Sequence, residues 1–115
     1  MTTTTPLDLA ETYFTAWQEQ DAPALRAILA DDVTFDGPMA TLDNADDAVE
    51  GLMGLAAATT ELTILKRLAD DTDVITWFEI TTQDAGPLPT SNWSHVENDK
   101  ITAIRVAFDP RPLVA

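Results

Sequence analysis

The chain has 115 residues, of which 45% are apolar, and this length and composition fit one domain, residues 1–115, with a real hydrophobic core. It carries 20 acidic and 6 basic residues, a net charge of −14, so we expect no nucleic-acid and no membrane partner. The absence of cysteine excludes disulfides and thiolate metal sites. The opening MTTTTP has neither basic residues nor an apolar run, so we expect a cytoplasmic protein without a secretory signal.

Three helices are predicted before residue 60. After a polar, frayed tail at residues 1–5, the first begins at Pro6 and ends near Gln20. Its buried stripe recurs at steps of three and four, with Tyr13 beside it, and comprises Leu7, Ala10, Phe14 and Trp17. A short second helix begins at Asp21-Ala-Pro23.

Between the second and third helices, residues 33–35 are expected to form a short strand, followed by the turn Asp36-Gly-Pro38. Asp43 or Asn44 caps the third helix, which buries Ala45, Val49, Leu52, Met53 and Ala56. Gly51 and Gly54 weaken that helix and leave room for close packing or for a pocket beside it.

From Glu61 the apolar residues alternate with period two, which indicates strands. Residues 74–80 are apolar on both faces, so we expect that strand to be covered on both sides. Residues 91–97 form the next strand, and Asn98-Asp99 turns the chain into the last one, KITAIRVAFDP. The order of elements predicts an α+β fold, with three helices on one face of a curved, mostly antiparallel sheet.

Three segments together resemble the nuclear-transport-factor-2-like superfamily, which includes the SnoaL-like polyketide cyclases and the ketosteroid isomerases. They are ETYFTAWQEQD with APALRAILADDVTF, then DNADDAVEGL, then HVENDKITAIRVAFDP. The resemblance covers nearly the whole chain and implies a cystatin-like cone that encloses an apolar pocket. It does not select an activity, because this fold hosts isomerases, cyclases, hydrolases, dehydratases and non-enzymatic binders.

Within such a cone, strand register predicts which side chains point inward. These are Val74, Thr76, Phe78, Ile80, Asn92, Ser94, Val96, Ile104, Val106 and Phe108. Trp17, Met39 and Met53 are expected to close the mouth. Trp77, Trp93 and His95 are expected on the outer face, through which members of the superfamily often dimerise, so we expect a homodimer.

Tyr13 and Asn92 are the candidates for polarising a ligand oxygen. The resemblance places Tyr13 where ketosteroid isomerases carry a tyrosine that donates to an oxyanion, and Asn92 where they carry a second, protonated acid. A phenol in a dry pocket stabilises developing negative charge well. The alternatives are a core tyrosine bonded to a carbonyl and a strand asparagine satisfied by its neighbours.

Asp36 is the candidate general base. The position that matches the isomerases' catalytic aspartate is Gly37, and a shift of one residue in a strand reverses the side chain's direction. Either a bulge returns Asp36 to the pocket, or it forms the turn before Gly37-Pro38 and the base is absent. The last-strand aspartate of the limonene-epoxide-hydrolase branch would fall at Val106, so that branch is disfavoured.

His95 is the only histidine, so no multi-histidine metal site is possible and no metal is expected. Register places it outward beside Glu97, and a slip of one residue would bring it into the pocket as an acid or base. Arg105 and Asp109 are expected to form an ion pair or a cap at the end of their strand rather than a catalytic pair.

These observations leave two readings of function. One is an enzyme without a cofactor, an isomerase, cyclase or dehydratase that moves a proton on a small apolar substrate. The other is a non-catalytic ligand-binding protein or dimeric scaffold of the same fold.

Overall fold

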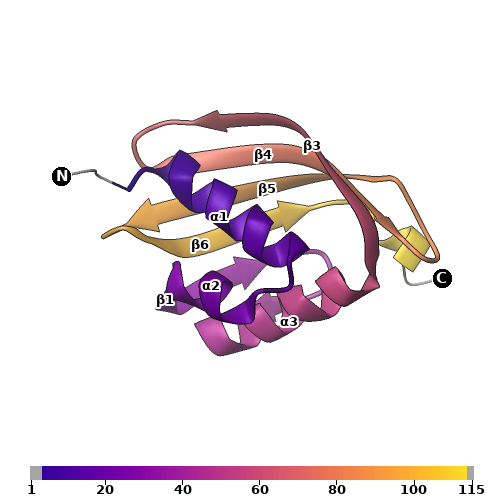
Figure 1. Cartoon of the computed structure of the whole chain (residues 1–115), viewed down its shortest axis with the longest axis horizontal. Helices are drawn as coiled ribbons and strands as arrows, with labels where there is room; N and C mark the ends of the chain where they lie inside the picture. Colours follow the sequence, from indigo (N-terminus) through magenta and orange to yellow (C-terminus); the bar gives the residue numbers. More distant parts are fainter. Residues whose placement is uncertain (1–3, 114–115) are drawn as a thin grey trace.

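The computed structural model describes residues 4–113, in which three helices pack on a six-stranded sheet (Figure 1). The helices are α1 (Pro6–Gln18), α2 (Ala22–Ala27) and α3 (Ala45–Ala58), and a short 3-10 helix, η1, covers Arg111–Leu113. The strands are β1 (Leu29–Asp36), β2 (Thr41–Leu42), β3 (Thr59–Ala69), β4 (Asp73–Thr82), β5 (Leu88–Glu97) and β6 (Lys100–Ala107). None of the described helices is long and apolar enough to cross a membrane.

The sheet is mixed and open, with the order β2-β1-β6-β5-β4-β3. Only β1 and β6 run parallel; the other neighbouring strands are antiparallel. Register shifts occur in three of the strand pairs, and such irregularities bend a sheet. The long strand β3 curves over to α3 (Figure 1). Side chains of the sheet and of the helices line an interior space between them. The predicted α+β class with a curved, mostly antiparallel sheet is confirmed.

The two longer helices, α1 and α3, each begin at a residue whose side chain caps the helix N-terminus. The Thr5 hydroxyl accepts from the Asp8 amide at 3.1 Å, and the Asp8 carboxylate accepts from the Thr5 amide at 3.1 Å, which is a capping box. Asn44, one of the two predicted caps of α3, accepts from the Asp47 amide at 2.8 Å. Residues 1–3 of the expected frayed tail lie outside the described residues, whereas Thr5 belongs to the helix start.

The buried face of α1 is wider than the predicted stripe. Leu7, expected inside, is 41% exposed, and Tyr13, expected beside the stripe, is only 3% exposed. The reason is that α1 lies between the sheet and the other helices, so that more than one stripe of its surface is covered (Figure 1). The buried residues of this helix are Pro6, Leu9, Ala10, Tyr13, Phe14, Ala16 and Trp17.

The alternation of β4 and β5 matches the prediction on the inner face. Val74, Thr76, Phe78 and Ile80 are buried, as are Asn92, Ser94 and Val96. The expectation that β4 is covered on both faces is wrong for the single chain, since Ile75 is 48% and Trp77 45% exposed. The helices cover only one face of the sheet, which leaves these side chains, with Trp93, on the open face (Figure 1).

Strand β1 is longer than the predicted residues 33–35 because it pairs in parallel with β6. Leu29 and Val33 of β1, Ile101 and Ile104 of β6 and Leu25 of α2 belong to the same hydrophobic core and are each at most 2% exposed. The second halves of β1 and β6 bear Phe35 and Val106, which border the interior space described next.

Candidate functional site

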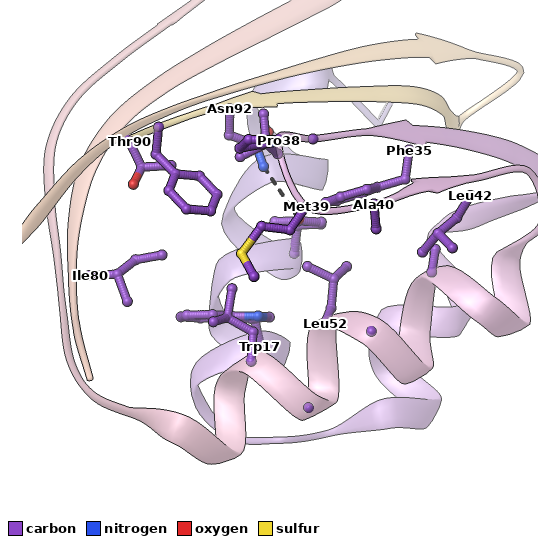
Figure 2. Close-up of a pocket in the computed structure, with 18 of the residues that line it drawn as sticks. Trp17, Phe35, Pro38, Met39, Ala40, Leu42, Leu52, Ile80, Thr90 and Asn92 are labelled. Atoms are coloured by element: carbon purple, nitrogen blue, oxygen red, sulfur yellow. Dashed lines mark hydrogen bonds between the residues drawn. The ribbon is translucent and has the colours of Figure 1, made fainter. Parts of the chain in front are cut away.

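A cavity of about 360 Å³ lies between α1, α3 and the inner face of the sheet (Figure 2). This is near the lower end of the size range of small-molecule sites in proteins. Its walls are overwhelmingly apolar and include Trp17, Phe35, Leu52, Ile80, Val106 and Phe108. Within residues 4–113, no aspartate, glutamate, histidine, lysine or arginine lines it. The cavity can therefore hold an apolar molecule but offers no charge to it.

Small residues keep the cavity open on the side of α3. Gly51 and Gly54 both line it, and a Cβ built on Gly54 would meet no heavy atom within 4 Å. Across from the helix, the loop between β1 and β2 reaches over the cavity, and Met39 in that loop is 54% exposed (Figure 2). The Gly37 amide donates to the Ala40 carbonyl at 2.9 Å and closes this loop. Of the two alternatives at these glycines, close packing or a pocket, the geometry places a cavity beside them.

The polar part of the cavity wall is a pair of side chains from α1 and β5. The Asn92 amide nitrogen, Nδ2, donates to the Tyr13 hydroxyl at 3.3 Å. Behind them, the Ser94 hydroxyl donates to the amide oxygen of Asn92 at 3.1 Å. All three residues are at most 3% exposed, and Tyr13 and Asn92 line the cavity whereas Ser94 does not. The sequence left open whether the Tyr13 hydroxyl bonds a backbone carbonyl. In the structure it accepts from Asn92 instead.

The environment keeps the Tyr13 phenol neutral. Burial raises the pKa of Tyr13 far above its ordinary value of 10.0, and the hydrogen bond from Asn92 offsets only part of that rise. Because Asn92 donates to the phenol oxygen, the phenol proton remains available to a molecule in the cavity. The site thus contains a neutral hydrogen-bond donor in apolar surroundings.

Two further residues of the cavity wall, Thr90 and Trp17, carry polar groups. Thr90 lines the cavity, but its hydroxyl already donates to the Leu88 carbonyl at 3.0 Å. Trp17 also lines it, and its buried indole nitrogen has no hydrogen-bond partner among the described residues. Sequence reasoning did not single out Thr90, although it lies two residues before Asn92 on the same face of β5, and period two identifies it.

Asp36 lies outside the cavity. Its carboxylate accepts from Arg105 Nη1 at 3.0 Å, and the two side chains are 44% and 56% exposed. Asp36 and Arg105 are register partners on β1 and β6, whereas the preceding residue, Phe35, faces the cavity. Strand alternation therefore turns the carboxylate to the outer face. The expected ion pair of Arg105 with Asp109 is wrong, because Arg105 pairs with Asp36. Asp109 pairs with Arg111 at 2.6 Å and, as the alternative of a cap expects, accepts from the Arg111 backbone amide at 3.1 Å.

His95 lies on the outer face as its register predicted. Its Nδ1 is 2.9 Å from the Asp73 carboxylate, which also accepts from the Trp93 indole at 2.7 Å. Partial burial opposes ionisation of Asp73, but hydrogen bonds from Thr72, Trp93 and His95 hold its pKa below the ordinary value. No cluster of His, Asp and Glu in residues 4–113 is arranged to hold a metal ion.

The predicted ligand-binding residues divide into two groups. Five of them line the cavity: Trp17, Met39, Phe78, Val106 and Phe108. Met53 does not, because it is half-buried against the core on another face of α3. Ser94 does not either, and it contacts the site through Asn92.

Residues 10–104 match the sequence profile of the SnoaL-like domain. The chain belongs to the SnoaL-like family. No curated protein matches its sequence significantly.

Solved structures of low sequence identity share this SnoaL-like fold. A protein of Kribbella flavida has a TM-score of 0.91 and 22% identity over 97% of this chain and 93% of its own. An NTF2-like protein of unknown function from Cytophaga hutchinsonii has a TM-score of 0.87 and 25% identity over 99% and 98%. An LEH-like epoxide hydrolase of M. tuberculosis has a TM-score of 0.75 and 19% identity over 92% and 84%. These similarities extend over nearly the whole chain.

Proposed function

We propose that this SnoaL-like protein binds a small, neutral, mostly apolar molecule that presents one hydrogen-bond acceptor to Tyr13. The observation that supports this most is the composition of the cavity wall, in which a buried phenol hydrogen-bonded to Asn92 is surrounded by apolar side chains. Burial of the ligand's apolar surface supplies most of the affinity, and the phenol fixes its orientation.

The charge of the protein supports a neutral ligand. A carboxylate or phosphate moved into this cavity would lose its hydration and meet no cation among the described wall residues. The net charge of −14 would also disfavour its approach. A ketone, ester or ether loses much less hydration and gains the Tyr13 hydrogen bond.

A second candidate is an enzyme that moves a proton on a carbonyl compound. It is favoured by the Tyr13–Asn92 pair, since a neutral phenol in a dry site stabilises an enolate oxygen. It also needs a base, and Asp36 pairs with Arg105 on the opposite face of β1. Hydrogen–deuterium exchange next to the carbonyl of a bound ketone separates the two candidates: Tyr13-dependent acceleration supports the enzyme, and an unchanged rate supports the binder.

A thermal-shift screen against steroids, polyketides, terpenoids and fatty acids tests the proposal. A ligand at a hundredfold excess over its dissociation constant stabilises the fold by about 2.7 kcal/mol. Tyr13→Phe removes the donor and keeps the cavity, whereas Val106→Trp fills the cavity and keeps the donor. Both should weaken a neutral hit.

Asp36→Asn serves as the matched control for that screen. It removes a carboxylate on the outer face and should leave the shift unchanged. A hit that tolerates both Tyr13→Phe and Val106→Trp binds elsewhere and contradicts the proposed site. A hit lost in Asp36→Asn binds at the outer face of the sheet and likewise contradicts the proposed site.

We also propose that a second copy of the chain covers the outer face of the sheet. Leu68, Ile75 and Trp93 are direct neighbours across β3, β4 and β5, and each is 45–64% exposed. Charges of both signs border this row, as a surface that pairs with itself requires. Arg105 stands over the Trp93 ring at 5.9 Å, and Asp73 accepts from the indole of the same residue. Light scattering should give a dimer for the native chain and a monomer for Trp93→Glu.

A further inference from the structure

The hydrogen bonds behind the cavity form a chain whose direction decides what Tyr13 offers to a ligand. The Asn92 amide lies between two hydroxyls, with Nδ2 3.3 Å from the Tyr13 oxygen and Oδ1 3.1 Å from the Ser94 oxygen. An amide donates at one end and accepts at the other, so the two hydroxyls are coupled through it. A half-turn of this one side chain would reverse both hydrogen bonds.

In the observed direction, Ser94 donates to Asn92, Asn92 donates to Tyr13, and the phenol proton is free for the cavity. In the reversed direction the Tyr13 hydroxyl would donate to Asn92, and its oxygen could only accept a hydrogen bond from a molecule in the cavity. Ser94 would then accept from Asn92, and its own proton would need a new acceptor.

The surroundings of Ser94 disfavour that reversal. Ser94 is 2% exposed, and within residues 4–113 its hydroxyl makes one hydrogen bond, the one to Asn92. Its register neighbours are Val74 on β4 and Ile104 on β6, whose apolar side chains cannot accept a proton. A buried hydroxyl proton without an acceptor is costly, whereas the free phenol proton faces a cavity that a ligand can fill.

We propose that Ser94 sets the hydrogen-bond polarity of the cavity, so that Tyr13 donates and the ligand must supply an acceptor oxygen. Ser94 acts as a positioning residue, because it does not line the cavity and reaches it only through Asn92. The inference rests on the proposed function and narrows its ligand class to carbonyl and ether compounds. Cooperative polarisation along the three groups further strengthens the terminal donor.

The direction of the chain can be measured without any ligand. In the native protein, nuclear Overhauser effects from the Asn92 side-chain amide protons should reach the Tyr13 ring more strongly than the Ser94 β-protons. Ser94→Ala frees the amide to turn, so these contacts should weaken or average. Ser94→Thr keeps the hydroxyl and should restore them. Thr59→Val, which removes a hydroxyl bonded to the Leu55 carbonyl at the end of α3, is the control for general loosening.

Two probes of the same shape then measure the preference. Bornane has the carbon skeleton of camphor with a CH2 group in place of the ketone. The native protein should bind camphor more tightly than bornane, and Ser94→Ala should reduce that ratio by roughly threefold to tenfold, the worth of one hydrogen bond. Thr59→Val should leave the ratio unchanged.

Each outcome bears on one of the two proposals. Nuclear Overhauser effects from the Asn92 side-chain amide that reach mainly Ser94 in the native protein would overturn the proposed direction. Equal binding of camphor and bornane would overturn it as well. A ratio that survives Ser94→Ala would overturn the role of Ser94. If neither probe binds, the proposed ligand class is wrong, while the amide contacts still decide the direction of the chain.

Discussion

The ionisation of Tyr13 gives a sharp test of how dry the site is. Tyr13 is the only tyrosine in the chain, so tyrosinate absorbance reports on one group. Burial raises its pKa far above the ordinary value of 10.0. Raising the pH above that value deprotonates the phenol in the unfolded chain but not in the folded one, so stability falls as pH rises. The free energy of unfolding should fall by about 1.4 kcal/mol near pH 11 and by about 2.7 kcal/mol near pH 12, if Tyr13 stays protonated in the folded state over this range.

The assay combines an absorbance titration with urea unfolding at each pH. The tyrosinate signal should appear only together with loss of the native circular dichroism. The difference in free energy of unfolding between the native chain and Tyr13→Phe should shrink as pH rises, with the slope of one proton. The phenylalanine variant lacks this ionisation, and the other titrating groups contribute equally to both proteins. A phenol that titrates with its ordinary pKa in the folded protein would show that Tyr13 is open to water and would refute a dry donor site.

Three further substitutions test the packing of the fold at an open, a buried and an exposed position. Gly54→Ala should stabilise by about 1 kcal/mol and raise the midpoint of thermal unfolding by about 4 °C, because its Cβ enters open space on an exposed helix interior. Leu25→Ala, at a fully buried position, should cost about 2 to 5 kcal/mol in urea unfolding. Asp36→Asn should cost less than about 1 kcal/mol, since its ion pair is exposed. A Gly54→Ala variant that is destabilised, a Leu25→Ala variant that is stabilised, or a loss of stability above about 1 kcal/mol in Asp36→Asn would contradict the packing described.

Local periodicity was sufficient to predict the faces of the long antiparallel strands. Successive side chains of a strand point to opposite faces whatever its partner, so alternation alone separates Phe78 and Asn92 from Trp77 and Trp93. The same rule places Asp36 opposite to Phe35, and the structure shows no bulge between them that returns the carboxylate to the cavity.

Contacts between distant segments could not be predicted in this way. The length of β1 depends on its parallel pairing with β6, about seventy residues later in the chain, and no pattern within residues 29–36 encodes that partner. The ion pair of Arg105 with Asp36 follows from the same strand pairing. The residues near Arg105 in the sequence predicted Asp109 as its partner instead. Leu7 fits a helical stripe, but which stripe is buried depends on how α1 lies on the sheet.

The hydrogen-bond chain also depends on tertiary structure. Tyr13 and Asn92 were candidates from the resemblance to the ketosteroid isomerases, but their direct bond arises because α1 crosses the inner face of β5. The position of Ser94 behind Asn92 is visible as period two in β5, yet its role depends on the apolar neighbours that the register supplies.

The carbon-13 resonance of a bound carbonyl tests the central claim most directly. A ketone labelled at this carbon, such as camphor, should show a downfield shift on binding to the native protein, because the Tyr13 phenol donates to its oxygen. The shift should be lost in Tyr13→Phe and retained in Asp36→Asn. A bound ketone whose carbonyl resonance is the same in the native protein and in Tyr13→Phe would contradict the assignment of Tyr13 as the donor of this site.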